Sequence, residues 1–350
     1  MDTEILCPTS RTDFERAAET IRSGALVAFP TETVYGLGAN GLDAAACARI
    51  YAAKGRPSDN PLILHIADLA MAHEVASDVP PTAAHLLTAF APGPLTVILP
   101  KAAHIPNIVT GGLSTVGVRC PDHDVARRLI RAAGVPIAAP SANTSGRPSP
   151  TSAAMVYDDM EGRIPLILDG GSCRLGVEST IVDCTEKDTV TILRPGAVTR
   201  EMIAAELPHI EVCMDAALTA EDAAPRAPGM KYTHYAPRMP LTVYVGTGTD
   251  VAAALREELL RRTATGERPA LIASNETIAA LSDIIHADDT YHCGARGNHS
   301  AFASCLYDAL RHFDTMPVTS LLAEGVAAVG LGTAIMNRLR KASGGDICFV

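Results

Sequence analysis

Basic side chains are concentrated in a short stretch where prolines exclude regular structure. Lys54 and Arg56 come just before the segment 57–61, which begins and ends with proline and carries Ser58 and Asn60. Proline disfavours both helix interiors and ladder pairing, so we expect these cations on an irregular loop. Lys and Arg beside hydroxyl and amide groups suit a phosphate or a carboxylate. The same pattern also fits a solvated helix end, where Lys54 would meet the negative end of the helix dipole.

Two further polar segments follow apolar runs that read as strands. The run 25–29 ends at Pro30 and leads into Thr31, Glu32 and Thr33, and the run 135–139 leads into the hydroxyl-rich segment 141–150. Strand ends are a common place for site residues in α/β sheets, and small residues let backbone N–H groups approach a ligand. Each segment alone is equally typical of an ordinary polar turn. Three such segments in one chain favour a site.

These segments, with four others in order, closely resemble the YrdC-type threonylcarbamoyl-AMP synthases. The matching motifs are Phe29-Pro-Thr-Glu-Thr-Val-Tyr-Gly-Leu-Gly38, Lys54-Gly-Arg-Pro-Ser-Asp-Asn-Pro-Leu62, 92–96, 116–121, 139–143, 176–181 and 193–196. The resemblance covers roughly residues 10 to 205 and extends through 227–237 and 330–341, which look like the linker and the end of the second domain in the long form of the family.

The resemblance implies a reaction of L-threonine, bicarbonate and ATP. The products would be threonylcarbamoyl-AMP, also called L-threonylcarbamoyladenylate, and pyrophosphate. A separate complex would then transfer the threonylcarbamoyl group to tRNA, at the adenosine beside the anticodon. This chemistry needs positioning and charge neutralisation at the α-phosphate rather than a covalent nucleophile, with Mg²⁺ on the phosphate oxygens.

The resemblance also assigns roles to individual residues. Lys54 and Arg56 are assigned to catalysis: Lys54 acts on the phosphates, and Arg56 either assists there or holds the threonine carboxylate. The residues matched to threonine contacts are Thr31, His65, Arg119, Ala139 and Ser179. The residues matched to ATP contacts are Lys54, Ser58, Thr115, Ser141, Asn143, Ser149, Arg194 and Tyr235, the last of these in a lid over the nucleotide. No metal-binding side chain is assigned.

Several of these residues have plainer explanations. Thr31 and its neighbour Thr33 are β-formers whose hydroxyls the backbone can satisfy. Arg119 fits bidentate recognition of a carboxylate, but also a cross-strand ion pair. His65, on the predicted strand 62–66, is as readily a core histidine as a substrate contact.

A dinucleotide fingerprint also occurs, as Gly36, Gly38 and Gly41, with Asp59 eighteen residues later. Thr31 to Thr33 separate the apolar strand from these glycines, and Lys54 would be an odd neighbour for a ribose, so the pattern disfavours a dinucleotide site. No P-loop motif is present.

Composition narrows the class of protein. The chain has 350 residues, 47% of them hydrophobic, and a net charge of −10, with 4% aromatic residues and no Trp. That balance argues against strong nucleic-acid binding and against aromatic base-stacking platforms. Nine scattered cysteines indicate reduced thiols rather than a disulfide framework or a zinc site. Neither a secretory signal nor a membrane span is evident, so we expect a cytoplasmic protein.

Periodicity predicts two α/β domains joined by a linker. Helices are expected over 12–24 and 43–54, and strand, loop and helix patterns alternate as far as about residue 207. The resemblance sharpens residues 1–210 to a YrdC-like twisted mixed sheet with a basic cavity. Residues 211–240 have a linker composition, and we expect this linker to fold over the active site. Residues 241–350 predict a smaller Rossmann-like α/β domain, with strands at 241–245, 270–273 and 319–323 and helices at 251–262 and 300–313.

Two other functions remain open from the residues. One is an RNA-binding module without catalysis, which the charge of −10 disfavours. The other is a carbamoyl-transfer domain of the hydrogenase-maturation type, whose zinc-finger cysteines and acylphosphatase part are missing from this sequence.

Overall fold

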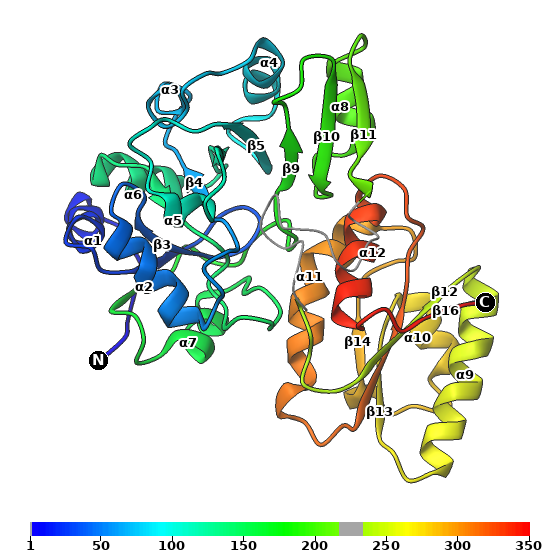
Figure 1. Cartoon of the computed structure of the whole chain (residues 1–350). Coiled ribbons are helices and arrows are strands. Elements are labelled where there is room, and N and C mark those ends of the chain that lie inside the picture. The colour runs from blue at the N-terminus through cyan, green and yellow to red at the C-terminus, as the bar shows by residue number, and fades with distance from the viewer. Residues whose placement is uncertain (1, 217–233) are drawn as a thin grey trace. The chain divides into compact units, whose positions relative to one another are not determined.

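The computed structural model describes residues 2–216 and 234–350, and these divide into two compact units (Figure 1). The first unit comprises Met1–Ser145 and Ser149–Tyr232, and the second comprises Gly146–Pro148 and Thr233–Val350. Most of the predicted linker, from 217 to 233, lies outside the described residues. Both units combine helices with a sheet, as the α/β prediction requires.

The described part of the first unit is built on an 11-stranded mixed sheet. Its strand order is β1-β8-β2-β3-β7-β4-β6-β5-β9-β10-β11. The strands are β1 Glu4–Leu6, β2 Val27–Phe29, β3 Gly36–Asn40, β4 Ile63–His65, β5 Leu95–Pro100, β6 Thr115–Arg119, β7 Ile137–Ala138, β8 Leu166–Leu168, β9 Thr180–Asp183, β10 Thr189–Arg194 and β11 Glu211–Met214. The helices are α1 Arg11–Arg22, α2 Ala44–Lys54, α3 Ala72–Val75, α4 Pro81–Phe90, α5 Asn107–Thr110, α6 Asp124–Ala133, α7 Ala153–Met160 and α8 Arg200–Glu206.

The core lies on both faces of this sheet. Along β2, Val27 and Phe29 belong to one buried apolar cluster, and Leu26 and Ala28 belong to the other. Alternate residues of a strand point to opposite faces, so the strand is buried on both sides. The polar residues that follow β2 therefore leave the sheet from a rigid, fully packed element.

The predicted amphipathic helix over 12–24 is confirmed as α1. Ser10 and Asp13 form a capping box at its start, and its buried residues Phe14, Ala17, Ala18 and Ile21 share a cluster with the buried side of α6. Local capping and the apolar stripe thus agree with the tertiary packing.

The helix predicted over 43–54 is confirmed as α2. The Asp43 carboxylate accepts hydrogen bonds from Ala45 N at 2.8 Å and Ala46 N at 3.2 Å. Gly55 ends the helix in the left-handed conformation, with φ of 63°. Lys54 is therefore the last helical residue rather than part of the loop, and its position is set by a cap at each end of α2.

The dinucleotide fingerprint is not a phosphate-binding turn. Gly36 and Gly38 lie within β3, which pairs antiparallel with β2. A Cβ on Gly38 would come within 2.8 Å of both Ile137 and Phe29. These glycines are required by close packing within the sheet, and this confirms that no Rossmann site is present here.

The far edge of the sheet extends beyond the predicted first domain. Glu211–Met214, placed in the linker by composition, forms β11 and pairs in parallel with β10. This short edge strand has only one fully buried side chain, Val212, so its apolar periodicity is weak.

The described part of the second unit has a five-stranded, all-parallel sheet in the order β14-β13-β15-β12-β16. Its elements are β12 Leu241–Val245, α9 Gly248–Ala264, β13 Pro269–Ala273, α10 Asn275–Leu281, η2 Ala287–Asp289, β14 Thr290–His292, α11 His299–His312, η3 Phe313–Thr315, β15 Ser320–Glu324, α12 Leu331–Ala342 and β16 Ile347–Phe349. The strands and helices predicted from periodicity are present, and the parallel sheet confirms the Rossmann-like class.

All nine cysteines fall within the described residues and are free thiols. Of the helices in residues 2–216 and 234–350, none has the length and apolar character to cross a membrane.

Replacing Asp43 tests whether the cap at the start of α2 stabilises this helix, whose last residue is Lys54. We expect Asp43→Ala to destabilise α2 by about 1 kcal/mol, because two amide groups lose their acceptor. Amide hydrogen exchange in 44–54, followed by mass spectrometry, should then accelerate about fivefold. The control is Asp43→Asn, which keeps an acceptor oxygen and should exchange at nearly the wild-type rate. Equal rates in all three proteins would contradict the prediction.

Candidate functional site

The turn after β2 is held by the first of its two threonines. Thr31 Oγ1 donates to Val34 O at 2.6 Å, accepts from Thr33 N and Val34 N at 3.2 Å each, and lies 2.8 Å from Thr33 Oγ1. The alternative explanation of Thr31, that the backbone satisfies its hydroxyl, is therefore correct in part, since this hydroxyl hydrogen-bonds to backbone groups of Thr33 and Val34. This ring of hydrogen bonds fixes the conformation of the turn, including the direction of Glu32 between the two threonines.

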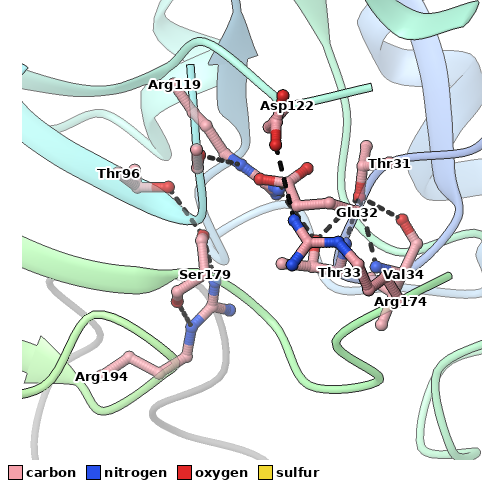
Figure 2. A network of polar contacts seen from close by, with 11 residues as sticks. Thr31, Glu32, Thr33, Val34, Thr96, Arg119, Asp122, Arg174, Ser179 and Arg194 are labelled. Carbon is pink, nitrogen blue, oxygen red and sulfur yellow. Dashed lines mark hydrogen bonds and ion pairs between the residues drawn. The ribbon is translucent and has the colours of Figure 1, made fainter. Parts of the chain in front are cut away.

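Arg119, at the end of β6, binds this turn (Figure 2). Its Nη2 lies 2.7 Å from Glu32 Oε2 and donates to Thr33 Oγ1 at 2.9 Å, and its Nε is 3.4 Å from Gly93 O. The Arg119 and Glu32 side chains are 5% and 2% exposed. Arg119 is thus in an ion pair, as the alternative explanation allowed, but its partner comes from the turn and not from a neighbouring strand.

His65 lies beside Arg119. It is on β4, where its Cα partners are Arg119 on β6 and Ile137 on β7, and its ring meets the edge of Phe29. Burial, aided by the positive charge of Arg119, lowers the pKa of His65 to about 3, so the imidazole is neutral near pH 7. Its Nδ1 is buried without a hydrogen-bond partner. A satisfied core histidine would have one, so a polar atom remains available here.

Ala139 follows β7 and is also buried. Its N–H donates to Ile63 O at 2.9 Å, which joins it to β4. The predicted threonine contacts Thr31, His65, Arg119 and Ala139 therefore come from neighbouring strands and from the turn after β2.

Ser179 joins the threonine set to the nucleotide set. Its hydroxyl lies 2.8 Å from Thr96 Oγ1 and accepts from Arg194 Nη2 at 3.2 Å, and its carbonyl accepts from Arg194 Nε at 3.0 Å (Figure 2). Ser179 was predicted to contact threonine and Arg194 to contact ATP. The structure brings these two predicted residues into direct contact.

Lys54 is directed into the loop that follows β7. Its side chain is buried, and Nζ donates to Ser141 O, to Asn143 O at 2.6 Å and to Asn143 Oδ1 at 3.3 Å. The loop itself is anchored by a bridge between Ser141 and Gly36 and by Ala142 N donating to Tyr35 O at 2.8 Å. Three residues predicted to act on ATP, Lys54, Ser141 and Asn143, are thus brought together.

The other predicted residues are more scattered. Arg56 is half-buried and donates to Asn60 O and Pro61 O, and Ser58 is exposed in the same turn. Thr115 lines a small cavity with Pro61, Leu62 and Gly117 among others. Ser149 is buried and donates to Glu178 Oε1 at 2.6 Å. Tyr235 lies in the second unit and stacks on Tyr307, with ring centroids 5.2 Å apart, so its predicted role as a lid stays a prediction.

Three polar residues of this network were not among the predicted site residues. Glu32 and Thr33 directly follow the predicted Thr31, and Thr96 ends the motif 92–96 that carried part of the family resemblance. A buried carboxylate beside a buried arginine is visible only once the turn and β6 are placed together. In the sequence, the indication of a role for these residues was that Glu32 and Thr33 lie in the matched motif 29–38 and Thr96 lies in the matched motif 92–96.

Chemically, the site combines buried cations with hydroxyl and amide groups. Lys54, Arg119 and Arg194 are each at most 7% exposed. The described residues contain no cluster of three or more His, Cys, Asp or Glu side chains that could hold a metal ion. Such a donor set suits anionic ligands, because phosphates and carboxylates satisfy guanidinium and ammonium donors.

Comparison with known proteins identifies two family domains along the chain. Residues 19–196 match the Sua5_yciO_yrdC family model, whose description is "Telomere recombination". Residues 198–344 match the model described as "Threonylcarbamoyl-AMP synthase, C-terminal domain".

Curated relatives match along nearly the whole chain. A threonylcarbamoyl-AMP synthase of Bacillus subtilis is 45% identical over 97% of this chain and 95% of its own length. One from Pyrococcus abyssi is 47% identical over 94% of this chain and 93% of its own. Among solved structures, P. abyssi Sua5 complexed with L-threonine matches with a TM-score of 0.92 and 44% identity over the full length of both chains.

The buried state of His65 makes a prediction about acid stability. The folded pKa of His65 is about 3 against about 6.5 when unfolded, so between those values only the unfolded chain takes up the proton. Its contribution to stability is complete above about pH 6.5 and is lost at up to about 1.4 kcal/mol per unit as pH falls toward 3. Urea midpoints at pH 7.5, 6 and 5 should therefore converge between wild type and His65→Asn as the pH falls. The control is His104→Asn, at an exposed histidine, whose difference from wild type should stay constant. A constant difference for His65→Asn would contradict the assignment.

Proposed function

The chain belongs to the threonylcarbamoyl-AMP synthase family, and from that premise we propose that its first unit condenses L-threonine, bicarbonate and ATP into threonylcarbamoyl-AMP and pyrophosphate. It is an enzyme of the nucleotidyltransferase type whose substrates include ATP and L-threonine. The observation that carries this conclusion is the 45% identity to a named synthase over 97% of the chain.

For the threonine end of the site, we assign the residues grouped around the turn after β2. Arg119 binds the threonine carboxylate, because a guanidinium offers paired donors to that group. Thr31, His65, Ala139 and Ser179 complete the contacts. The neutral His65 ring offers Nδ1, which has no hydrogen-bond partner in the structure, to a polar group of the substrate without adding a charge beside Arg119.

For the nucleotide end, we assign the residues around the loop after β7. Lys54 and Arg56 serve the phosphates as catalytic cations. Lys54 is supported by its contacts with the carbonyl oxygens of Ser141 and Asn143, which place its ammonium group at the loop. The remaining ATP contacts are Ser58, Thr115, Ser141, Asn143, Ser149, Arg194 and Tyr235.

The reaction then needs positioning more than covalent catalysis. The threonine ammonium first loses a proton, and the free amine attacks the carbon of bicarbonate-derived CO₂. The adduct loses a second proton to give the carbamate, and one carbamate oxygen attacks the α-phosphorus as pyrophosphate leaves. The hydrogen bond between Arg194 and Ser179 supports a single pocket for both reactants, because it keeps a residue assigned to ATP next to a residue assigned to threonine. Bringing both reactants together in one pocket is a large part of such a rate enhancement.

Mg²⁺ belongs to the substrate in this proposal, carried on the ATP phosphates. The described residues offer no cluster of three metal-ligating side chains, and Mg²⁺ commonly keeps its waters and binds through phosphates. The product serves threonylcarbamoyl transfer to tRNA by a separate complex. The net charge of −10 supports the view that this chain itself binds no nucleic acid tightly.

Pyrophosphate release tests the proposed activity. We expect release from Mg²⁺-ATP only when threonine and bicarbonate are both supplied, together with an adduct of AMP that has the mass of threonylcarbamoyl-AMP. Omission of either substrate is the internal control. Release of pyrophosphate without threonine would indicate simple nucleotide hydrolysis. If the folded protein releases no pyrophosphate but binds tRNA tightly, the RNA-binding alternative would be favoured.

Substitution of the two buried cations tests the residue assignments. Arg119→Ala should raise the KM for threonine, and Lys54→Ala should raise the KM for ATP and lower kcat, each by about tenfold to a hundredfold, because a charge-assisted hydrogen bond is lost. Steady-state pyrophosphate assays measure both effects.

Matched controls exist within the same unit. Arg16→Ala removes an exposed arginine paired with Glu4, and Lys101→Ala removes a lysine that donates to Ile105 O and Asn107 Oδ1. Both should retain wild-type kinetics. Near wild-type kinetics in Arg119→Ala and Lys54→Ala would refute the assignment of the site.

A further inference from the structure

The Glu32 carboxylate has unused hydrogen-bonding capacity. It is 2% exposed, and Oε2 lies 2.7 Å from Arg119 Nη2. That nitrogen directs its hydrogen bond to Thr33 Oγ1, and neither carboxylate oxygen of Glu32 has a hydrogen-bond partner in the structure. An ionised carboxylate offers about four lone-pair sites, and leaving them unused while buried costs free energy.

A buried carboxylate with a structural role looks different in this same chain. Glu324, in the second unit, is 5% exposed and accepts from Ser274 N at 2.8 Å, Ser274 Oγ at 2.7 Å and Arg296 Nε at 3.3 Å. Asp183, buried in the first unit, accepts from the backbone and the hydroxyl of Thr185. Unlike Glu324 and Asp183, Glu32 has an ion-pair partner but accepts no hydrogen bond in the structure. Such a buried carboxylate can accept hydrogen bonds from a ligand.

Among the described residues, no other side chain donates a hydrogen bond to the Glu32 carboxylate. Arg174, beside the Leu175 whose N–H donates to the backbone carbonyl of Glu32, pairs instead with Asp122 at 3.4 Å. Two titratable groups that interact electrostatically with this carboxylate are Cys120 and His123. Burial raises the pKa of the Cys120 thiol and lowers the pKa of His123, so both are uncharged near neutral pH. Arg119 and Glu32 therefore form a buried pair with no net charge.

Charge balance decides which ligands this pair accepts. Threonine carries a carboxylate and an ammonium group on the same carbon. A ligand with only the carboxylate would place two anions on one guanidinium in a buried setting, which is strongly unfavourable. A zwitterion brings its own cation and leaves the pocket neutral.

We propose that Glu32 binds the α-ammonium group of threonine while Arg119 binds its carboxylate. This inference rests on the proposed function, since it assumes that threonine occupies this pocket. Oε1 and Oε2 of Glu32 receive N–H donors from the ammonium group, and the pair of opposite charges in the protein matches the pair in the ligand. Figure 2 shows the Glu32 and Arg119 side chains directed toward one another from the turn and from β6. Glu32 thereby selects ligands that carry an amine beside the carboxylate and holds the nitrogen that becomes the carbamate.

Paired ligands and variants test this assignment by isothermal titration calorimetry. The ligands are L-threonine and the 2,3-dihydroxybutanoate of matched stereochemistry, in which a hydroxyl replaces the ammonium group. Wild type should bind threonine at least about tenfold more tightly, as expected for a hydrogen-bonded charge pair. Glu32→Gln should lose most of that preference, because its amide contacts an ammonium and a hydroxyl about equally. Glu32→Asp keeps the charge and should keep a preference for threonine.

The result that overturns the proposal is a Glu32→Gln variant that binds both ligands more weakly by the same factor. Glu32 would then act only by holding Arg119, which both ligands use. If Glu32→Gln does not fold, wild type alone still decides, since equal affinity for the two ligands also overturns the proposal. Failure of wild type to bind threonine at all would instead refute the threonine site of the proposed function, so the two failures are distinguishable.

Discussion

The buried positive charge of Arg119 is the constraint around which the threonine end of the site is organised. A charged arginine side chain that is 5% exposed needs a negative partner and acceptors inside the protein, or its burial would be prohibitive. Glu32 supplies the charge, and Thr33 and Gly93 supply acceptors. Glu32 and Thr33 belong to the turn after β2, and Gly93 lies just before β5. The Arg119 side chain on β6 therefore contacts both of these segments. The neutral state of His65 depends in part on the same charge.

Lys54 organises the nucleotide end in a similar way. An ammonium group buried at the end of α2 is held by carbonyl oxygens of Ser141 and Asn143, and this loop is in turn joined to β3 by the bridge between Gly36 and Ser141. The turn after β2 leads directly into β3. The two ends of the site are therefore connected through one short strand whose glycines allow close packing.

Buried carboxylates among the described residues are satisfied to different degrees. In the second unit, Glu324 at the end of β15 accepts hydrogen bonds from Ser274, which follows β13, and from Arg296, which follows β14, as befits a structural cluster. In the first unit, Glu32 and His65 Nδ1 remain without hydrogen-bond partners although both are buried. Unsatisfied buried groups are costly and are therefore uncommon outside sites that bind a ligand. Their occurrence beside Arg119 distinguishes this part of the sheet from an ordinary core.

The sequence by itself determined the features that depend on neighbouring residues. The cap at Asp43, the amphipathic stripe of α1 and the regular alternation in 241–350 are local, so α1 and α2 and, in the second unit, β12, β13, β15, α9 and α11 were predicted to within a few residues. The elements β14, β16, α10 and α12 were not predicted. The ordered motifs identified the family and, through it, most of the residues that line the site. Tertiary structure decided the pairings. Glu32 and Arg119 are 87 residues apart, as are Lys54 and Ser141, and the local pattern of neither segment specifies its partner. Register between strands placed His65 in the buried sheet beside Arg119, and burial, aided by that charge, lowers the pKa of His65. Parallel pairing with β10 turned part of the expected linker into β11. Burial and charge at these positions are properties of contacts between distant segments, and for that reason only the folded chain shows them.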